Sequence, residues 1–208
     1  MAENVWDKPP PPGASDLPTV AHWVVEQSPS SKELVEQWAD RYWLPGDPGQ
    51  TVLDVGCGNG TYAVVFGARG LHYTGIDISH EMIGMAREKF PDCDFYEGDV
   101  TALPFADNSF DYAFTRATLY HLPLEAAKVA IGEMIRVARL AAIVGLFSVT
   151  RGARCERMTR FGTYQRRGTL GEDLAMMLEF DPDTEVRVVN IAMGRTRAAE
   201  AYYIVRKC

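Results

Sequence analysis

Residues 52–61 have the sequence Val52-Leu53-Asp54-Val55-Gly56-Cys57-Gly58-Asn59-Gly60-Thr61. A strand-forming apolar run leads into three glycines at alternate positions, and glycine allows positive φ and close contact between a ligand and the main chain. The spacing is Gly-x-Gly-x-Gly, which is neither the Gly-x-Gly-x-x-Gly of dinucleotide-binding loops nor a P-loop. We therefore expect a ligand-binding loop at the carboxyl end of a first strand, and no pyrophosphate bound to it.

Beyond this loop, strand-forming runs alternate with helical patterns. Helices are expected at 61–69, 79–90 and 127–138, and strands at 73–76, 95–96, 112–114 and 141–147. This alternation predicts an α/β fold with a parallel sheet. The last two apolar runs, 185–191 and 201–205, flank a short polar turn and predict an antiparallel hairpin that closes the sheet.

The N-terminal segment differs from the rest of the chain. Residues 1–29 contain the four consecutive prolines Pro9–Pro12, which favour an extended conformation. This segment is either a disordered tail or a flap that closes over a ligand. Ser30 and Glu33 form a capping box that predicts a helix. We therefore expect a flexible N-terminal segment or flap at 1–29 and a single domain at 30–208.

Composition limits the classes of function. The 208-residue chain has 21 Lys and Arg against 28 Asp and Glu, a net charge of −7, which argues against a nucleic-acid partner and an anionic membrane surface. The longest apolar run, Leu140–Phe147, is too short to span a bilayer, and no secretory signal is visible. The four cysteines contain no CxxC pair and suggest free thiols without a metal site. A cytoplasmic enzyme is expected.

Two acidic residues follow the predicted second and third strands. Asp77 ends one strand and Asp99 follows the next. A carboxylate can accept hydrogen bonds from two neighbouring ribose hydroxyls, and another can accept one from an adenine amino group. Each acid alone would more often be a solvated strand end. Their order with the glycine loop favours a nucleoside-containing ligand.

Residues 52–147 resemble the class I S-adenosylmethionine-dependent methyltransferases, in particular their small-molecule type. The matching pieces are LDVGCGNGTY (53–62), TGIDISHEMIGMARE (74–88), FYEGDVTALPFADNSFDYAF (95–114), LYHLP (119–123) and the helix ending in RVAR (136–139). The resemblance implies a Rossmann-like doubly wound seven-stranded sheet of order 3-2-1-4-5-7-6, ending in the antiparallel hairpin. It also implies S-adenosylmethionine as the cofactor.

The resemblance also implies a set of cofactor-binding residues. They are Asp54, Gly56, Cys57, Gly58, Asp77, Ile78, Met82, Asp99, Val100, Thr115 and Arg116. Gly56 and Gly58 would pass beneath the methionine and ribose parts of the cofactor. Asp77 would hold the ribose hydroxyls, and Ile78 would pack on the adenine.

The remaining positions complete this expected site. Asp99 and the Val100 backbone would contact the adenine edge, while Thr115 and Arg116, just past the fourth strand, would lie near the methionine end. One departure is visible, because Arg139-Leu140-Ala141-Ala142 stands where the family usually has Lys/Arg-Pro-Gly-Gly. This change is expected to affect a turn remote from the cofactor.

Candidate catalytic residues follow the fourth strand. His121 is the best candidate base, because an imidazole suits proton removal near neutrality; alternatively it only hydrogen-bonds the backbone and shapes the pocket. Tyr120 is a weaker candidate as wall or hydrogen-bond donor. No Asp/Asn-Pro-Pro-Tyr follows the fourth strand, which argues against methylation of a planar amide nitrogen in DNA or protein.

Six arginines lie between positions 151 and 167, and the first four recur every third residue, near one helical face. They form either a solvated face or a site for a substrate carboxylate or phosphate, which guanidinium groups bind bidentately. Arg154, Arg157 and Tyr164 are therefore candidate substrate-binding residues. Met176 and Met177 suggest ordinary helix core.

The combined prediction is a methyltransferase that acts at O, N or C of a small-molecule acceptor, with an anionic metabolite favoured by the arginines. The alternatives are a non-catalytic S-adenosylmethionine-binding regulatory protein, a protein or peptide side-chain methyltransferase, and an NAD-dependent oxidoreductase. The sequence identifies neither the acceptor nor the oligomeric state.

Overall fold

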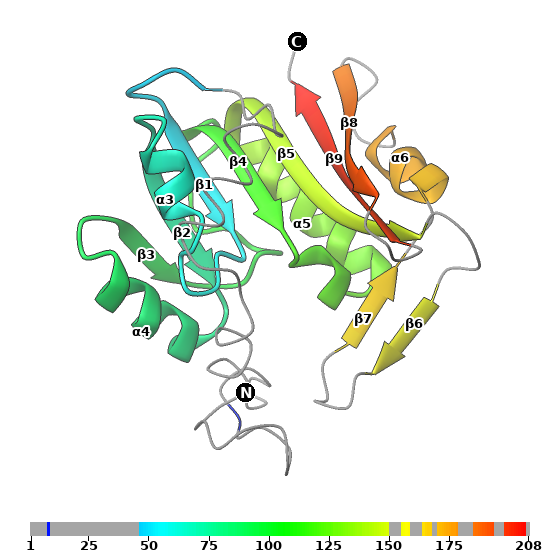
Figure 1. The fold of residues 1–208 in the computed structure, drawn as a ribbon, viewed down its shortest axis with the longest axis horizontal. Coiled ribbons are helices and arrows are strands. Elements are labelled where there is room, and N and C mark those ends of the chain that lie inside the picture. Colours follow the sequence, from blue (N-terminus) through cyan, green and yellow to red (C-terminus); the bar gives the residue numbers. More distant parts are fainter. Residues whose placement is uncertain are drawn as a thin grey trace. The chain divides into compact units, whose positions relative to one another are not determined.

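The computed structural model describes residues 8, 46–149, 155–158, 164–167, 170–178, 185–193 and 198–206. Apart from Lys8, the expected N-terminal segment and the helix after Ser30 lie outside these residues. The chain divides into two compact units, of which unit 1 holds the described residues up to Val100 together with Met158, and unit 2 holds the others. Figure 1 gives the element labels.

Unit 1 contains three parallel strands and two helices. Its elements are β1 (Thr51–Val55), α3 (Ala63–Gly67), β2 (His72–Asp77), α4 (His80–Lys89) and β3 (Asp94–Glu97). β2 pairs with β1 on one side and with β3 on the other, both in parallel. Because parallel strands end at the same edge, the residues that follow β1, β2 and β3 meet there. This edge positions the candidate cofactor site.

Local chemistry explains the helix boundaries in unit 1. α4 begins after Ser79, whose Oγ accepts a hydrogen bond from Met82 N at 3.1 Å, as expected for an N-cap serine. It ends before Pro91, which cannot continue a helix. α3 is shorter than the helix expected over 61–69, and Tyr62 before it and Ala68 after it have right-handed backbone conformations as its flanking residues.

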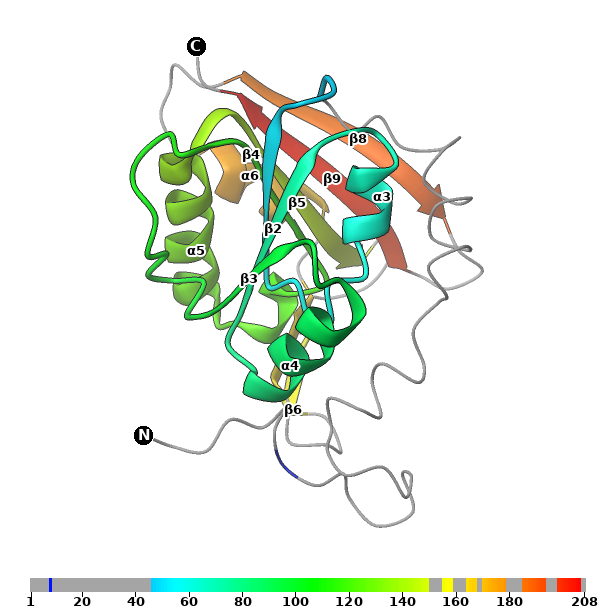
Figure 2. The same ribbon diagram turned by 90° about the vertical axis from the view of Figure 1, so that its left-hand side faces the viewer.

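Unit 2 contains strands, helices and a separate two-stranded sheet. Its main elements are β4 (Phe110–Arg116), the 3-10 helix η2 (Leu119–His121), α5 (Leu124–Val137), β5 (Ala138–Val149), α6 (Leu170–Leu178), β8 (Glu185–Met193) and β9 (Ala198–Arg206). β4 pairs with β5 in parallel, and β9 pairs antiparallel with both β5 and β8. α5 lies along β4 and β5 (Figure 2).

The main sheet has the hydrogen-bonded order β3-β2-β1-β4-β5-β9-β8. The Rossmann-like α/β class is thereby confirmed, and so is the antiparallel C-terminal hairpin. With β8 and β9 counted as the sixth and seventh strands of this sheet, the order reads 3-2-1-4-5-7-6. The expectation that 30–208 form a single domain stays a prediction.

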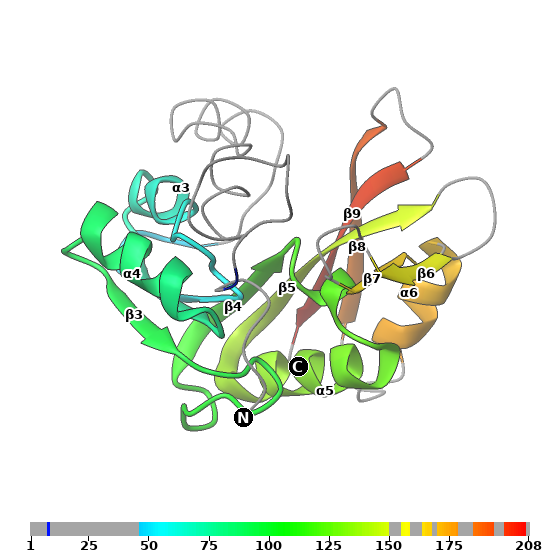
Figure 3. The same ribbon diagram turned by 90° about the horizontal axis from the view of Figure 1, so that it is seen from below.

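The arginine-rich segment differs from its expected form. Its described parts are the strands β6 (Cys155–Met158) and β7 (Tyr164–Arg167), which pair with each other, so the helical face inferred from the three-residue spacing is wrong there. Pairing between residues several positions apart overrides local periodicity in so short a segment. β7 lies against η2 and β5, as Figure 3 shows for β7 and β5.

Two expectations about strand ends are also corrected. Thr115 and Arg116 are the last two residues of β4, not residues beyond it. The expected turn at 139–142 does not exist, because Ala138 is already extended and α5 passes directly into β5. An Ala-Arg-Leu-Ala-Ala stretch has no glycine or proline to form a turn there.

Candidate functional site

The glycine loop is tied to the neighbouring strand through one carbonyl. Gly56 N and Cys57 N both donate to Ile76 O, at 2.8 and 3.0 Å. Gly58 has a φ of 55°, a conformation that strains other residues. A Cβ added to Gly58 would meet only Met82 Sδ, at 3.8 Å. The loop therefore presents bare backbone next to the start of α4.

Asp77 holds the loop from the end of β2. Its Oδ2 accepts a hydrogen bond from Gly58 N at 2.8 Å, and its Oδ1 accepts one from Ser79 N at 2.9 Å. Each oxygen of an ionised carboxylate can accept more than one hydrogen bond. Asp77 thus links the glycine loop to the α4 N-cap at the carboxyl end of β2.

Asp54 lies beneath this loop, not on its surface. The side chain is 1% exposed and accepts a 2.6 Å hydrogen bond from Tyr73 Oη. Burial raises the pKa of Asp54 to about 7; the Asp77 charge adds to this rise, and the Tyr73 hydrogen bond opposes it. The sequence pattern did not point to Tyr73, although its place in β2, next to the strand that carries Asp54, could have suggested this partner.

Cys57 fills space between the loop and β2. Its side chain is buried, and a Cβ on Gly75 would lie 2.7 Å from Cys57 Sγ, so Gly75 makes room for the thiol. Burial, followed by the charges of Asp54 and Asp77, raises the Cys57 pKa. A buried thiol with a raised pKa is unreactive, so Cys57 contributes packing and its backbone to the site.

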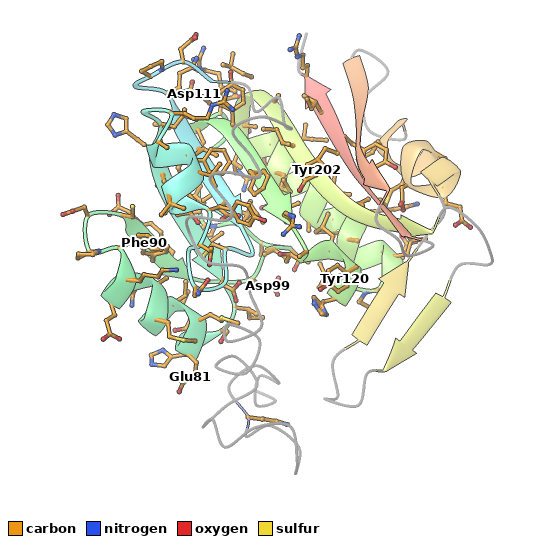
Figure 4. All side chains as sticks on the ribbon, viewed as in Figure 1. Glu81, Phe90, Asp99, Asp111, Tyr120 and Tyr202 are labelled. Carbon is orange, nitrogen blue, oxygen red and sulfur yellow. The ribbon has the colours of Figure 1, made fainter. Side chains whose placement is uncertain are left out.

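The edge of unit 1 continues toward β3. Gly98 N donates to Asp77 O at 2.9 Å, which holds the segment carrying Asp99 beside the end of β2. Asp99 is exposed, and Figure 4 labels it. Ile78 is 50% exposed, whereas the Val100 side chain is buried. The exposed apolar side chain of Ile78 can pack against the face of a planar ring.

The outer rim of the same edge holds a hydrogen-bonded pair of a histidine and a glutamate. His80 Nδ1 lies 3.0 Å from Glu97 Oε2, and both side chains are more than half exposed. Solvent-exposed pairs of this kind contribute little to stability. His80 and His72 are both exposed.

The candidate catalytic residues lie in unit 2. Tyr120 and His121 belong to η2, and their ring centroids are 4.1 Å apart. Both side chains are partly exposed, and Figure 4 labels Tyr120. Thr115 is fully buried at the end of β4, and Arg116 beside it is partly exposed.

The candidate substrate-binding residues come from the two-stranded sheet. Tyr164 begins β7, which lies against η2, and Arg157 lies in β6, the partner strand of β7. Unit 2 therefore brings the backbone of β7 to the helix that carries Tyr120 and His121. Arg154 lies outside the described residues.

No helix among the described residues is long and apolar enough to cross a membrane. Within the same residues, no group of three or more His, Cys, Asp or Glu side chains is arranged to hold a metal ion.

Known proteins resemble both the sequence and the fold. Residues 52–140 match the family model described as a methyltransferase domain. A demethylmenaquinone methyltransferase of Renibacterium salmoninarum is 42% identical over 92 residues, which cover 44% of this chain and 38% of that protein. An O-methyltransferase of Aspergillus sclerotiorum is 30% identical over 158 residues, 68% of this chain and 58% of that protein.

A solved structure extends the likeness in fold. The S-adenosylmethionine-dependent methyltransferase of Methanosarcina mazei has a TM-score of 0.64 at 20% identity, covering 79% of this chain and 94% of that one. The chain therefore contains a methyltransferase domain of the class I S-adenosylmethionine-dependent type at residues 52–140. It spans only 38% and 58% of the length of the two curated relatives.

Proposed function

We propose that the protein is an S-adenosylmethionine-dependent methyltransferase that methylates a small molecule at O, N or C. The observation that carries this proposal is the Asp77 carboxylate, which Gly58 N and Ser79 N fix at the end of β2, beside the glycine loop. A pair of ribose hydroxyls needs such an acceptor at the end of β2. The methyltransferase relatives support the same reaction class.

The residues of unit 1 fit S-adenosylmethionine. Gly58 has no side chain, so a ligand can occupy the space that a Cβ would partly fill. The half-exposed Ile78 offers an apolar face for adenine. Asp99 and the Val100 backbone are proposed to contact the adenine edge. When bound, the cofactor supplies an electrophilic methyl group, so no covalent bond to the protein is needed.

Several proposed cofactor residues have indirect roles. Asp54 and Cys57 are buried and are proposed to support the loop from below, while Met82 borders Gly58. Thr115 and Arg116 stay predictions for the methionine end. Because Thr115 is fully buried, its contribution is expected to come from its backbone.

The reaction then depends on orientation and proton removal. An acceptor must lie in line with the methyl group, and a hydroxyl or protonated amine must also lose its proton. We propose His121 as the group that holds or removes this proton at an imidazole nitrogen, and Tyr120 as the wall beside it. Their ring centroids are 4.1 Å apart, which supports the proposal that both rings border the same acceptor.

An anionic acceptor is part of the proposal. Arg157 lies on β6 and Tyr164 on β7, which lies against η2. Arginine binds carboxylates and phosphates in a bidentate geometry. Arg154 is proposed to assist from the same segment. The net charge of −7 disfavours nucleic acid as the acceptor.

A methyl-transfer screen tests this function. The full chain is incubated with methyl-labelled S-adenosylmethionine and a panel of phenols, quinols, amines, carboxylic acids and peptides. Transfer to a small molecule, lost in His121→Ala and kept in His72→Ala, supports the proposal. Transfer to peptides alone would replace it with side-chain methylation. Cofactor binding without transfer to any panel member would favour a regulatory protein.

A further inference from the structure

Two non-glycine residues in the described part of the chain have positive φ, namely Asn108 at 56° and Ala117 at 61°. Asparagine tolerates this region because its short polar side chain forms local hydrogen bonds. The backbone N–H of Asn108 also donates to Arg136 O at 3.0 Å. Alanine has no polar side chain, and its Cβ is crowded in the left-handed conformation. The conformation of Ala117 therefore requires an explanation outside the residue itself.

The surroundings of Ala117 supply the constraint. Thr115 before it is fully buried, and Leu119 after it is 1% exposed. Thr118 Oγ1 donates to Arg116 O at 3.3 Å, a hydrogen bond that spans Ala117. Strained backbone persists only where neighbouring structure fixes it on both sides.

The adjacent strand adds to this constraint. Arg116 pairs with Gly145 of β5, and a Cβ on Gly145 would lie 3.1 Å from Thr115 O and 2.8 Å from the Tyr202 ring. Because Gly145 has no side chain, both the Thr115 carbonyl and the Tyr202 ring can approach it closely. The pairing with β5 thus fixes the position of the last residues of β4. The chain turns sharply immediately after them.

The turn at Ala117 sets the direction of η2. His121 N donates to Thr118 O at 2.9 Å, so Thr118, the N-cap of η2, directly follows Ala117. The Tyr120 and His121 rings project from this turn with centroids 4.1 Å apart. A change in φ at Ala117 would swing the whole of η2, and both rings with it.

We propose that Ala117 is a positioning residue whose left-handed backbone fixes Tyr120 and His121 at the carboxyl end of β4. The importance of those rings rests on the proposed function, but the geometric relationship does not. A side chain that disfavours the left-handed region should displace the rings, and glycine should preserve them. Ala117 would act through η2 without contacting substrate or cofactor.

The test compares matched substitutions at the two left-handed positions. Ala117→Val and Asn108→Val each place a β-branched residue where it is least tolerated, and Ala117→Gly removes the crowded Cβ. The readout is the ring-proton NMR signal of His121, assigned by its loss in His121→Gln. Tyr120→Leu gives the position of this signal without the neighbouring ring.

We expect Ala117→Val to move the His121 signal away from its wild-type position, because η2 carries both rings out of their present surroundings beside β5 and β7. A shift larger than the difference between wild type and Tyr120→Leu shows that more than the neighbouring ring has changed. Asn108→Val should lower Tm while leaving that signal in place. Ala117→Gly should keep the signal and raise Tm by about 2–4 °C, because glycine adopts positive φ without steric cost.

Three results would overturn the inference. The first is a wild-type His121 signal in Ala117→Val, and the second is an equal displacement in Asn108→Val. The third, a fall of Tm in Ala117→Gly, remains decisive even if the valine variant does not fold. Calorimetry of the wild type with S-adenosylhomocysteine separates the two proposals, because absent binding contradicts the proposed function and leaves the NMR comparison valid.

Discussion

Gly58 donates its backbone N–H to Asp77 Oδ2 across 2.8 Å, joining the glycine loop after β1 to the last residue of β2. This bond places a carboxylate beside bare backbone at the edge where open α/β sheets bind ligands. The same carboxylate caps the turn into α4 through Ser79 N. Loop, strand end and helix start therefore form one cradle, and substitutions in it should change ligand binding more than stability.

Asp54 should make stability depend on pH. Its pKa is 3.8 in the reference state and about 7 in the folded protein, so the folded state binds more protons between these values. Its contribution to stability is fully present below pH 3.8 and is lost as the pH rises through about 7. Denaturant unfolding of wild type and Asp54→Asn at several pH values measures it.

The expected result for Asp54 is a pH-dependent difference in unfolding free energy between wild type and Asp54→Asn. The free energy of unfolding of the wild type, minus that of Asp54→Asn, should fall as the pH rises from 4 to 7. Using the difference cancels the contribution of the other acids, because both proteins share all of them. A flat difference would show that Asp54 titrates normally in the folded protein.

Arg136 should be a strong stabilising residue of unit 2. Its guanidinium donates to Glu133, to Asp107 and to the carbonyls of Leu103 and Phe105. The Arg136 hydrogen bonds lower the Glu133 pKa. Arg136→Ala removes all of these hydrogen bonds at once and should cost about 2–3 kcal/mol of unfolding free energy.

Arg139 is the matched control for Arg136. It lies three residues later, is 56% exposed, and pairs with the Asp111 carboxylate. Because exposed ion pairs contribute roughly 0–1 kcal/mol, Arg139→Ala should cost less than 1 kcal/mol. Equal losses in the two variants, measured by chemical denaturation, would be inconsistent with the clamp at Arg136.

Gly60 should be intolerant of a side chain. Its φ is 69°, and an added Cβ would lie 2.7 Å from the Phe95 ring. Gly60→Ala should therefore cost about 2–3 kcal/mol through crowding and backbone strain. Gly67, at the end of α3, has no atom within 4 Å of an added Cβ, so Gly67→Ala should leave Tm unchanged or slightly higher.

The arginine segment is tested by single substitutions once an acceptor is known. Loss of one charge-assisted contact with an anionic acceptor should lower kcat/KM. The corresponding loss of transition-state stabilisation is about 1.5–3 kcal/mol. Arg154→Ala and Arg157→Ala are compared with Arg87→Ala, in which the substituted arginine belongs to α4 and donates to Phe95 O. Wild-type kcat/KM in both segment variants would leave these arginines as solvated surface charges.

Most of unit 1 could be predicted from the sequence because its signals are local. The apolar run of β1 and the glycines after it define a strand and a loop, and Ser79 before an amphipathic pattern defines the start of α4. The positions of Asp77 and Asp99 followed from the ends of the predicted strands. Each of these inferences depends on a few neighbouring residues.

The features that escaped prediction depend on distant partners. Tyr73 becomes important only because β1 and β2 pair and bring its hydroxyl to Asp54. The strands β6 and β7 form by pairing with each other, which the arginine spacing did not reveal. The left-handed Ala117 has no sequence signature at all, because glycine or asparagine would normally mark such a turn.

Asp77 is the residue whose loss should weaken cofactor binding most clearly. Asp77→Ala should weaken binding of S-adenosylhomocysteine by roughly 1–3 kcal/mol, because a ribose contact goes unpaired. Asp77→Asn, which keeps one acceptor oxygen, should lose less. Asp92→Asn, an exposed acid between α4 and β3, should bind as the wild type does.

The central claim is that the cradle around Gly58 and Asp77 binds S-adenosylmethionine. Titration calorimetry of the full chain with S-adenosylhomocysteine and, separately, with NAD tests it most directly. We predict saturable binding of S-adenosylhomocysteine that is weakened in Asp77→Ala, and no binding of NAD. Tight binding of NAD with no response to S-adenosylhomocysteine would contradict the claim and favour an oxidoreductase.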